Sequence, residues 1–491
     1  MAMYTFKFIK HISLFLLILF SLGACSAWLD VTPADSVTED ELLSTKEGFH
    51  QALNGIYLDM NSNSLYGATL LCRDIEVMAQ RYAINTNNKN YSELSKFKYN
   101  TTTYAKDVFE GTWNSAYNLI LSINKLIAQA ETKKDMLGTE YNLIRGELFG
   151  LRAMLHFDMF RLFGPVLLVH PNDKAIPYKT SPLLETTPLL PAPEVGEKLL
   201  ADLKEAETAL AADPARISGP NNDPNSNDFW SSRALRMNYY AVKALEARVA
   251  LYLAPLDAKY KTQAFNAATA VIKENNEKKW FPFVNISQIR VSKPDRIFST
   301  EVLFMNENIR RSEQSHLAYF ASSISPENIL IPNSDMLGGL FPGSDYEVDD
   351  NPDIRYKPIW KPAAEISGLC FNKYASVNDG VSNDLVPLIR LSEMYLIAAE
   401  TAPTVEEGFG YLNEFLPHRG LETILSDNDL SLCIQKEYRK EFFGEGQLFF
   451  FYKRMKASYM SVTGDEPWDG INISSPDVYV VPLPESETMY H

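Results

Sequence analysis

Apolar side chains recur at helical spacing along most of this 491-residue chain. Leu53, Ile56 and Met60 follow Phe49 at intervals of four, three and four residues, which places all four side chains on one face of a helix. Similar stripes, interrupted by glycine and proline, predict an all-α fold. The predicted helical scaffold covers about residues 41–60, 104–163, 195–274 and 385–455.

Local signals refine this plan. Two capping boxes, Thr38 with Glu41 and Ser44 with Glu47, can satisfy amide groups at helix starts. Alanines at 241, 244, 247 and 250 would let a second helix approach closely, as in paired-helix solenoids. No strict period of about 34 residues is visible, so the expected hairpins are degenerate tetratricopeptide-like repeats. In the last range we expect helices over residues 385–401, 405–416 and 430–444, and another past Gln447.

Two stretches break the helical pattern. Residues 61–103 are polar and irregular, and residues 275–384 contain eight prolines between positions 282 and 362 and one strand-like run at 301–305. Both are predicted to be loop-rich insertions. Loops on a rigid scaffold can change side chains without disturbing a core, so ligand binding is expected there.

The first 25 residues have the pattern of an export signal. Lys7 and Lys10 precede an apolar run from Ile12 to Ala24, which is too short to span a bilayer. The following Cys25 completes Leu22-Gly23-Ala24-Cys25, which resembles the lipobox of bacterial lipoproteins. We expect residues 1–24 to be a lipoprotein signal peptide, Cys25 to carry the lipid, and residues 25–491 to form one domain. Ordinary secretion with an incidental Cys25 remains the alternative.

Charge and motif content narrow the function. A net charge of −16 argues against nucleic acid as a partner. The four cysteines contain no C-x-x-C pair, and neither an H-E-x-x-H nor a G-x-S-x-G motif is present. An all-helical glycoside hydrolase remains open, because a pair of catalytic carboxyls can be drawn from 62 acidic residues.

Four sequence blocks are spread over nearly the whole chain. They are Trp28-Leu29-Asp30 with Pro33; Glu147, Arg152-Ala153, Phe157, Arg161 and Gly164-Pro165; Ile389-Arg390, Glu393, Tyr395-Leu396 and Ala399-Glu400; and Glu437, Arg439, Glu441-Phe442, Glu445-Gly446-Gln447 and Lys453-Arg454. These blocks, in this order, resemble the SusD/RagB family of outer-membrane lipoproteins. The chain departs from that family at Tyr438 and Leu448, where arginine is frequent, and at Phe451, where aspartate is frequent.

The resemblance implies nutrient capture without catalysis. Such proteins are anchored to the outer membrane by their lipid and face the cell surface. They enclose a glycan or peptide together with a SusC-like TonB-dependent transporter. A glycan is the expected ligand and a peptide the alternative within the family; a periplasmic protein-binding scaffold is a further alternative. Charged motif residues such as Arg152 and Glu147, or Arg390 and Glu393, are expected to form buried ion pairs of the scaffold.

A sugar ligand would need aromatic platforms and a few directional polar groups, because pyranose C–H faces pack on rings while hydroxyls donate and accept hydrogen bonds. Aromatic, arginine and aspartate side chains in the two insertions are therefore the binding candidates. These are Tyr66, Arg73, Asp74, Arg81, Tyr82, Tyr91, Tyr346, Arg355, Tyr356, Trp360 and Tyr374.

No cofactor is expected. A weak calcium candidate is an acidic cluster in the second insertion, for which a solvated charged loop is the simpler interpretation. Its members are Asp345, Glu347, Asp349, Asp350 and Asp353.

Overall fold

The computed structural model describes residues 38–220, 226, 228–342, 351–363, 366–377, 382–460 and 470–489. The predicted signal peptide and Cys25 lie outside these ranges. The chain divides into two units, residues 1–49 and residues 50–491. In the first, α2 (Glu39–Leu42) begins with the predicted capping box of Thr38 and Glu41. The second predicted box is wrong in its acceptor, because Thr45 rather than Ser44 accepts from the Gly48 amide at 3.1 Å.

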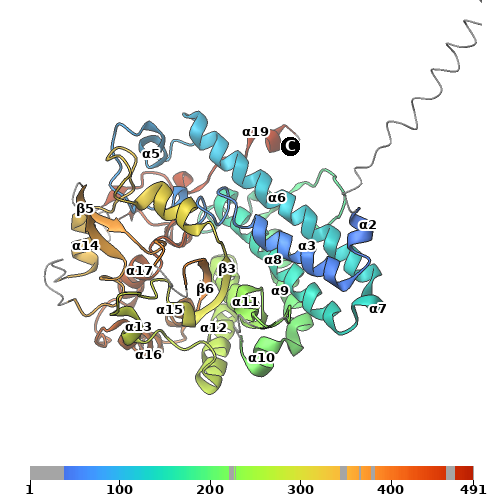
Figure 1. Ribbon diagram of the computed structural model, residues 1–491. Helices are drawn as coiled ribbons and strands as arrows, with labels where there is room; N and C mark the ends of the chain where they lie inside the picture. The colour runs from blue at the N-terminus through green and yellow to red at the C-terminus, as the bar shows by residue number, and fades with distance from the viewer. Residues whose placement is uncertain are drawn as a thin grey trace, which may run out of the picture. The chain divides into compact units, whose positions relative to one another are not determined.

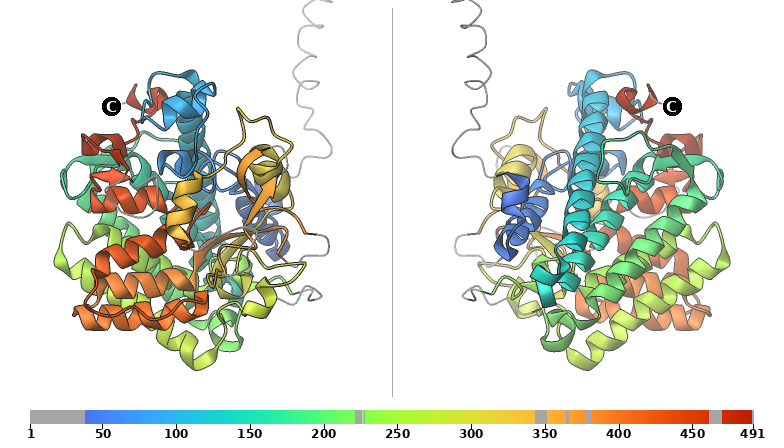
Figure 2. Two further views of the ribbon diagram at one scale, coloured as in Figure 1. Left: turned by 90° about the vertical axis from the view of Figure 1, so that its left-hand side faces the viewer. Right: turned by 90° about the vertical axis from the view of Figure 1, so that its right-hand side faces the viewer.

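Helices are the main regular structure of residues 50–491, as predicted (Figures 1 and 2). Consecutive long helices pack against each other, from α6 on α8 through to α15 on α16, which is the paired-helix arrangement of tetratricopeptide-like folds. No helix within the described residues is long and apolar enough to cross a membrane. The long helices are α3 (Lys46–Asp59), α6 (Thr103–Thr132), α8 (Tyr141–Phe163), α9 (Ala192–Ala209), α11 (Tyr239–Leu253), α12 (Ala258–Lys278), α15 (Leu391–Thr401), α16 (Val405–Phe415), α17 (Leu430–Glu441) and α18 (Leu448–Met455).

Small residues allow the close packing of α8. A Cβ atom on Gly146 would lie 2.4 Å from Leu210 Cγ, and one on Gly150 would lie 2.5 Å from Met237 Cγ. The alanine face of α11 is fully buried, as its small side chains predict. The close packing of the scaffold helices therefore depends on glycine and alanine at these positions, because a larger side chain would collide with the neighbouring helix.

The first insertion, residues 61–103, is a series of turns with two short helices, α4 (Asp74–Met78) and α5 (Lys89–Leu94). The second contains short strands, short helices and a π-helix over Ser312–Phe320. π-Helices are rare and are frequent at functional sites. The elements of the second insertion are α13 (Ile286–Ile289), η4 (Ser299–Glu301), β3 (Val302–Glu307), α14 (Ser334–Leu340), β4 (Trp360–Ala363) and β5 (Ile366–Phe371).

One predicted helix begins with a strand. Residues 385–390 form β6 (Leu385–Arg390), which pairs antiparallel with β3 and sets Met305 opposite Pro387. A short, continuous apolar run fits a buried strand as well as a helix, and the pairing with β3 decides between them. The strand pair ties the second insertion to the scaffold just before α15.

The remaining elements are short connections. Four of them are strands that form two antiparallel pairs, β1 with β2 and β7 with β8. They are α7 (Lys134–Leu137), η1 (Gly138–Glu140), β1 (Lys174–Pro177), β2 (Leu189–Pro191), η2 (Leu210–Ala212), α10 (Pro214–Ser218), η3 (Arg233–Leu235), η6 (Leu416–Arg419), β7 (Tyr459–Met460), β8 (Ile471–Asn472), η7 (Pro476–Tyr479) and α19 (Glu485–Thr488).

The charged motif residues form buried ion pairs between elements, as predicted, although their partners differ from those nearest in sequence. Arg152 forms a two-pronged pair with Asp202 of α9 at 2.6 and 2.7 Å. Glu147 pairs with Arg233 instead. Arg390 pairs with Glu441, Glu445 and Glu301, and Glu393 pairs with Arg248. These residues serve the scaffold.

Candidate functional site

A buried carboxylate organises a half-exposed cluster between the two insertions. Asp74, the first residue of α4, is 0% exposed and accepts three hydrogen bonds. Thr69 Oγ1 donates to Asp74 Oδ2 at 3.0 Å, and Arg73 Nε donates to the same oxygen at 2.6 Å. Tyr104 OH donates to Asp74 Oδ1 at 2.6 Å. The carboxylate thereby fixes both a guanidinium and a phenol ring.

The second insertion contributes Tyr319 to this cluster. Arg73 Nη1 donates to Tyr319 OH at 2.5 Å, and the guanidinium carbon lies 5.2 Å from the centre of that ring. Tyr319 belongs to the π-helix, which is held to the first insertion by Ser315 Oγ donating to Gly67 O at 3.2 Å. Arg73 and Tyr319 are 246 positions apart in sequence, so only the folded chain brings them together.

A third ring completes the cluster. Tyr91 of α5 packs edge to face on Tyr104, with ring centres 5.7 Å apart and planes at 86°. Tyr91, Tyr104, Tyr319 and Arg73 are all half-buried, so each retains surface in contact with solvent. We call these four side chains, together with Asp74, the tyrosine cluster.

Amide side chains lie where the insertions meet beside the cluster. Asn88 Nδ2 donates to Asn328 Oδ1 at 3.1 Å, and Asn85 Nδ2 lies 3.5 Å from Pro326 O. The backbone joins there as well, since the Ala83 amide donates to Ile331 O at 2.8 Å. These amides offer both donors and acceptors near the rings.

Burial sets the protonation of the cluster. Burial, and then the Asp74 carboxylate, raise the pKa values of Tyr91 and Tyr104 above the ordinary tyrosine value. Burial lowers the pKa of Arg73, but Asp74 and the tyrosines more than compensate, so the pKa stands above its ordinary value. The phenols therefore remain hydrogen-bond donors at neutral pH, and the arginine remains a cation paired with a carboxylate. Such a cluster can hold a polar ligand by rings and directional hydrogen bonds.

Three of the candidate residues chosen from the sequence lie in this cluster, namely Arg73, Asp74 and Tyr91. Tyr346 lies outside the described residues. The other seven candidates are buried. Those residues are Tyr66, Arg81, Tyr82, Arg355, Tyr356, Trp360 and Tyr374.

Each buried candidate has a local partner. Tyr82 OH donates to Cys72 O at 2.6 Å, and Tyr374 OH donates to Gly444 O at 2.7 Å. Trp360 is 1% exposed and packs edge to face on Phe443 at 4.7 Å. Tyr66 OH donates to Asp158 at 2.6 Å. Such rings attach the insertions to the scaffold, and any contact of theirs with a ligand stays a prediction.

The buried arginines also have local roles. The Arg81 guanidinium lies beside the Glu76 carboxylate at 3.2 Å and over the ring of Phe443. Arg355 forms a two-pronged pair with Asp353 at 2.7 and 2.8 Å, and contacts Glu437 and Glu441 as well.

Most of the acidic cluster proposed as a calcium site lies outside the described residues. Asp345, Glu347, Asp349 and Asp350 lie outside the described residues, and Asp353 is engaged by Arg355. Across the described ranges, no group of three or more histidine, cysteine, aspartate or glutamate side chains is arranged to hold a metal.

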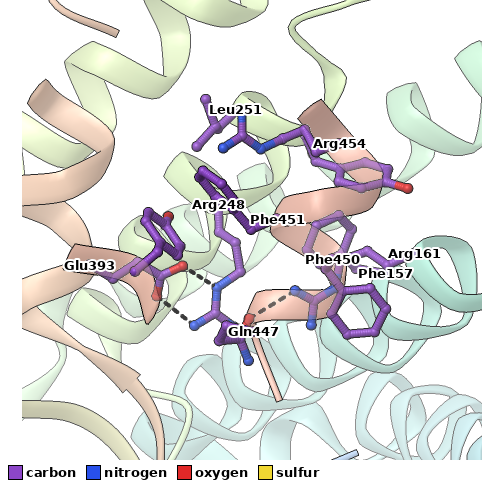
Figure 3. A pocket seen from close by; sticks show the side chains of 11 residues that line it. Phe157, Arg161, Arg248, Leu251, Glu393, Gln447, Phe450, Phe451 and Arg454 are labelled. Atoms are coloured by element: carbon purple, nitrogen blue, oxygen red, sulfur yellow. Dashed lines mark hydrogen bonds and ion pairs between the residues drawn. The ribbon is translucent and has the colours of Figure 1, made fainter. Parts of the chain in front are cut away.

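A small cavity elsewhere does not suit a glycan. It lies between α8, α11, α15, α17 and α18, and its volume is about 30 Å³, close to the share of one water molecule in the liquid (Figure 3). Arg248 donates to Glu393 through two bonds of 2.6 Å, and Arg161 Nη1 donates to Gln447 Oε1 at 2.9 Å. The cavity thus belongs to the ion pairs of the scaffold.

Sequence reasoning missed Tyr104 and Tyr319. Tyr104 was assigned to the scaffold because it begins a helical pattern, and its position at the first turn of α6 is what aims it at Asp74. Tyr319 lies in the second insertion, but no arginine or aspartate next to it in sequence indicated a binding role. For Tyr104, the available signal was an aromatic side chain at the start of a predicted helix, next to the first insertion.

Comparisons with known proteins agree with the sequence motifs. A family model described as "Starch-binding associating with outer membrane" matches residues 27–221. SusD-like protein P38 of Formosa agariphila is 26% identical over 292 residues, which cover 56% of this chain and 49% of P38. The chain therefore spans about half the length of this curated relative.

Solved structures share the fold over most of the chain. A SusD superfamily protein from Bacteroides thetaiotaomicron aligns with a TM-score of 0.70 and 22% identity, over 91% of this chain and 98% of that one. A SusD-like carbohydrate binding protein from Bacteroides vulgatus aligns with a TM-score of 0.66 and 18% identity, over 91% and 96%.

Proposed function

We propose that the chain, as a member of the SusD/RagB family, captures a glycan at the tyrosine cluster and delivers it to a SusC-like TonB-dependent transporter. The family description, with its starch binding and outer-membrane association, supports this assignment. The carbohydrate-binding description of the Bacteroides vulgatus relative supports it too.

The observation that carries the proposal is the arrangement of three half-exposed tyrosine rings around the Arg73–Asp74 pair. Ring faces can pack against pyranose C–H groups, while phenol, guanidinium and amide groups bond to hydroxyls. Because the cation and the carboxylate neutralise each other, the cluster suits a neutral ligand better than a charged one.

Binding without catalysis fits this site. Asp74, the acid of the cluster, already accepts bonds from Thr69, Arg73 and Tyr104. Glycoside hydrolysis needs two carboxyl groups facing the scissile bond, one to protonate the leaving group and one to act as base or nucleophile. Asp74 instead has the contacts of a positioning residue.

Attachment to the outer membrane is part of the proposal. Cys25 would carry acyl chains, each buried CH₂ of which contributes about 0.8 kcal/mol, so that two or more chains hold the protein on the bilayer at the cell surface. The transporter would supply the other wall of the ligand site, and weak affinity at each wall then suffices.

An array of glycans and peptides tests the proposed function directly. The mature protein is applied together with a Tyr91→Ala, Tyr319→Ala double variant, which removes two rings of the cluster. Binding to one or more glycans, lost in the double variant, supports the proposal. Binding to peptides alone identifies a peptide-capturing member of the family and contradicts glycan capture.

A further inference from the structure

A shallow groove lies open to solvent between α12 and α16, with a volume of about 690 Å³. In Figure 1, α12 and α16 lie at the lower end of the helical unit, while α5 and the start of α6, which hold the tyrosine cluster, lie at the upper end. The groove is lined by Asn266, Thr269, Ala270, Ile272, Lys273, Asn276, Glu277, Tyr411 and Glu414.

We infer that this groove is a second contact site for a neutral glycan chain, which rests on the proposed function of glycan capture. The lining residues of α12 recur every three or four positions and so share one face of the helix. From Asn266 to Asn276 this face extends about 15 Å at 1.5 Å per residue. An extended ligand can therefore lie along the helix.

The polar groups of the groove match hydroxyl groups. Asn266 and Asn276 are exposed amides, each able to donate and to accept. Glu414 is held in place, because Asn276 Nδ2 and Tyr395 OH both donate to its Oε1 at 3.0 Å. The other oxygen of this exposed carboxylate remains available to accept from a ligand.

An aromatic ring stands in the same groove. Tyr411 is half-buried and packs edge to face on Phe265, with ring centres 5.8 Å apart and planes at 81°. This contact orients the ring, while its exposed part can pack against a sugar. The groove thus pairs a ring with directional polar groups, as the tyrosine cluster does.

The charges of the groove favour a neutral ligand. Lys273, Glu277 and Glu414 all line the groove, so an acidic glycan would meet two carboxylates and one ammonium. A neutral glycan meets both hydrogen-bond donors and hydrogen-bond acceptors. Two contact sites on one molecule would hold a long polysaccharide more tightly than a short oligosaccharide, because the second contact becomes intramolecular after the first.

Affinity electrophoresis of the full mature protein tests this inference. The gels contain one soluble neutral polysaccharide each: starch, xyloglucan, galactomannan, arabinoxylan or laminarin. The variants are Tyr411→Ala, an Asn266→Ala, Asn276→Ala double variant that changes only exposed side chains, and Tyr319→Ala. Tyr459→Ala serves as a matched control, since Tyr459 is 37% exposed and outside both sites.

We expect the polysaccharide that retards the wild type to retard the Tyr411→Ala and the double-asparagine variants about fivefold less, with the control unchanged. Wild-type retardation in both groove variants, with loss only in Tyr319→Ala, would overturn the inference and leave the proposed function standing. If no polysaccharide retards the wild type, the proposed function and the inference fail together.

Discussion

Among single residues, Tyr82 and Tyr91 show how similar sequence contexts can lead to different roles. Both are tyrosines of the first insertion, nine positions apart. Tyr82 is 6% exposed, gives its hydroxyl to Cys72 O and packs near Phe320 and Phe443. Tyr91 is only half-buried and packs edge to face on Tyr104. An insertion of this length builds its own small core from aromatics, so ring type alone does not indicate exposure.

Trp360 is expected to stabilise the fold. Replacing it by alanine would remove a fully buried ring packed on Phe371 and Phe443. We predict a loss of about 3–5 kcal/mol in the free energy of unfolding, the usual cost of deleting a buried tryptophan. Urea unfolding measures it, with Tyr459→Ala as the exposed control. An unchanged unfolding midpoint in Trp360→Ala would show that its ring is not part of the core.

His156 is expected to make stability depend on pH. The ring is buried and stacks on Tyr178, its Nε2 accepts from the Lys179 amide, and its Nδ1 lies 3.0 Å from Arg152 O. Burial lowers the pKa of His156 to about 3. The unfolded chain, with a histidine pKa near 6.5, therefore binds this proton first as the pH falls.

The stability that depends on neutral His156 is thus complete above about pH 6.5 and is lost as the pH falls toward 3. Each pH unit in this window costs roughly 1.4 kcal/mol, so we predict a loss of about 2–3 kcal/mol between pH 6.5 and 4.5. Urea midpoints of the wild type and of His156→Gln across this range measure it. Equal slopes in the two proteins would contradict the assignment.

Among elements, the helices were predictable where apolar stripes recur over several turns. Residues 405–415 and 430–441 became α16 and α17 close to their predicted bounds. The strand at 385–390 was not predictable from its own sequence, because its partner β3 lies about 80 residues away and decides its conformation. The local sequence pattern thus predicts helices whose apolar residues recur over several turns. It does not predict a strand whose conformation depends on pairing with a distant segment.

The last hairpin shows where the chain differs from the SusD/RagB pattern that it resembles. Tyr438 and Phe451 occupy positions where arginine and aspartate are frequent in that family. Their rings lie 4.6 Å apart with planes at 31°. An aromatic contact therefore joins two positions at which that pattern has charged residues.

A buried ion network joins four elements. Arg390 of β6 and Arg419 of η6 both contact Glu301 of η4 and Glu441 of α17. Burial raises the pKa of Glu441, but Arg419 and Arg390 outweigh it and hold that pKa well below its usual value. The network extends to Glu445 beside Arg390 and to Arg355 beside Glu441, so each buried charge has an opposite charge next to it.

Removing one cation should be costly. We predict that Arg419→Met lowers the free energy of unfolding by about 3–5 kcal/mol, because it leaves buried carboxylates uncompensated. Guanidinium unfolding measures the loss. Arg310→Met, at an exposed arginine outside the network, is the control and should change stability little. Similar stability in both variants would mean that the ion network does not stabilise the packing of η6.

In the whole molecule, the candidate site exists only because distant segments meet. The insertions could be identified from the sequence as irregular and polar, and Arg73, Asp74 and Tyr91 fell within them. The pairing of Arg73 with Tyr319 could not be foreseen, since 246 positions separate the two and the π-helix gives no clear sequence signal.

Attachment to the membrane is expected to depend on Cys25. Cys25→Ala should abolish acylation and move the protein from the membrane fraction to the soluble fraction. Fractionation of cells after a carbonate wash measures this, with Cys433→Ala as a control that leaves the lipobox intact. A Cys25→Ala protein that still pellets with membranes would contradict the anchor.

The central claim is that the tyrosine cluster binds the glycan, and calorimetric titration of Tyr319→Ala with the glycan selected by the array tests it most directly. Removing a half-exposed ring should raise Kd about five- to tenfold, since one stacked ring contributes roughly 1 kcal/mol, and should leave the melting temperature close to that of the wild type. Tyr459→Ala should bind as the wild type does. Unchanged affinity in a folded Tyr319→Ala protein would contradict the account and move the glycan site away from this cluster.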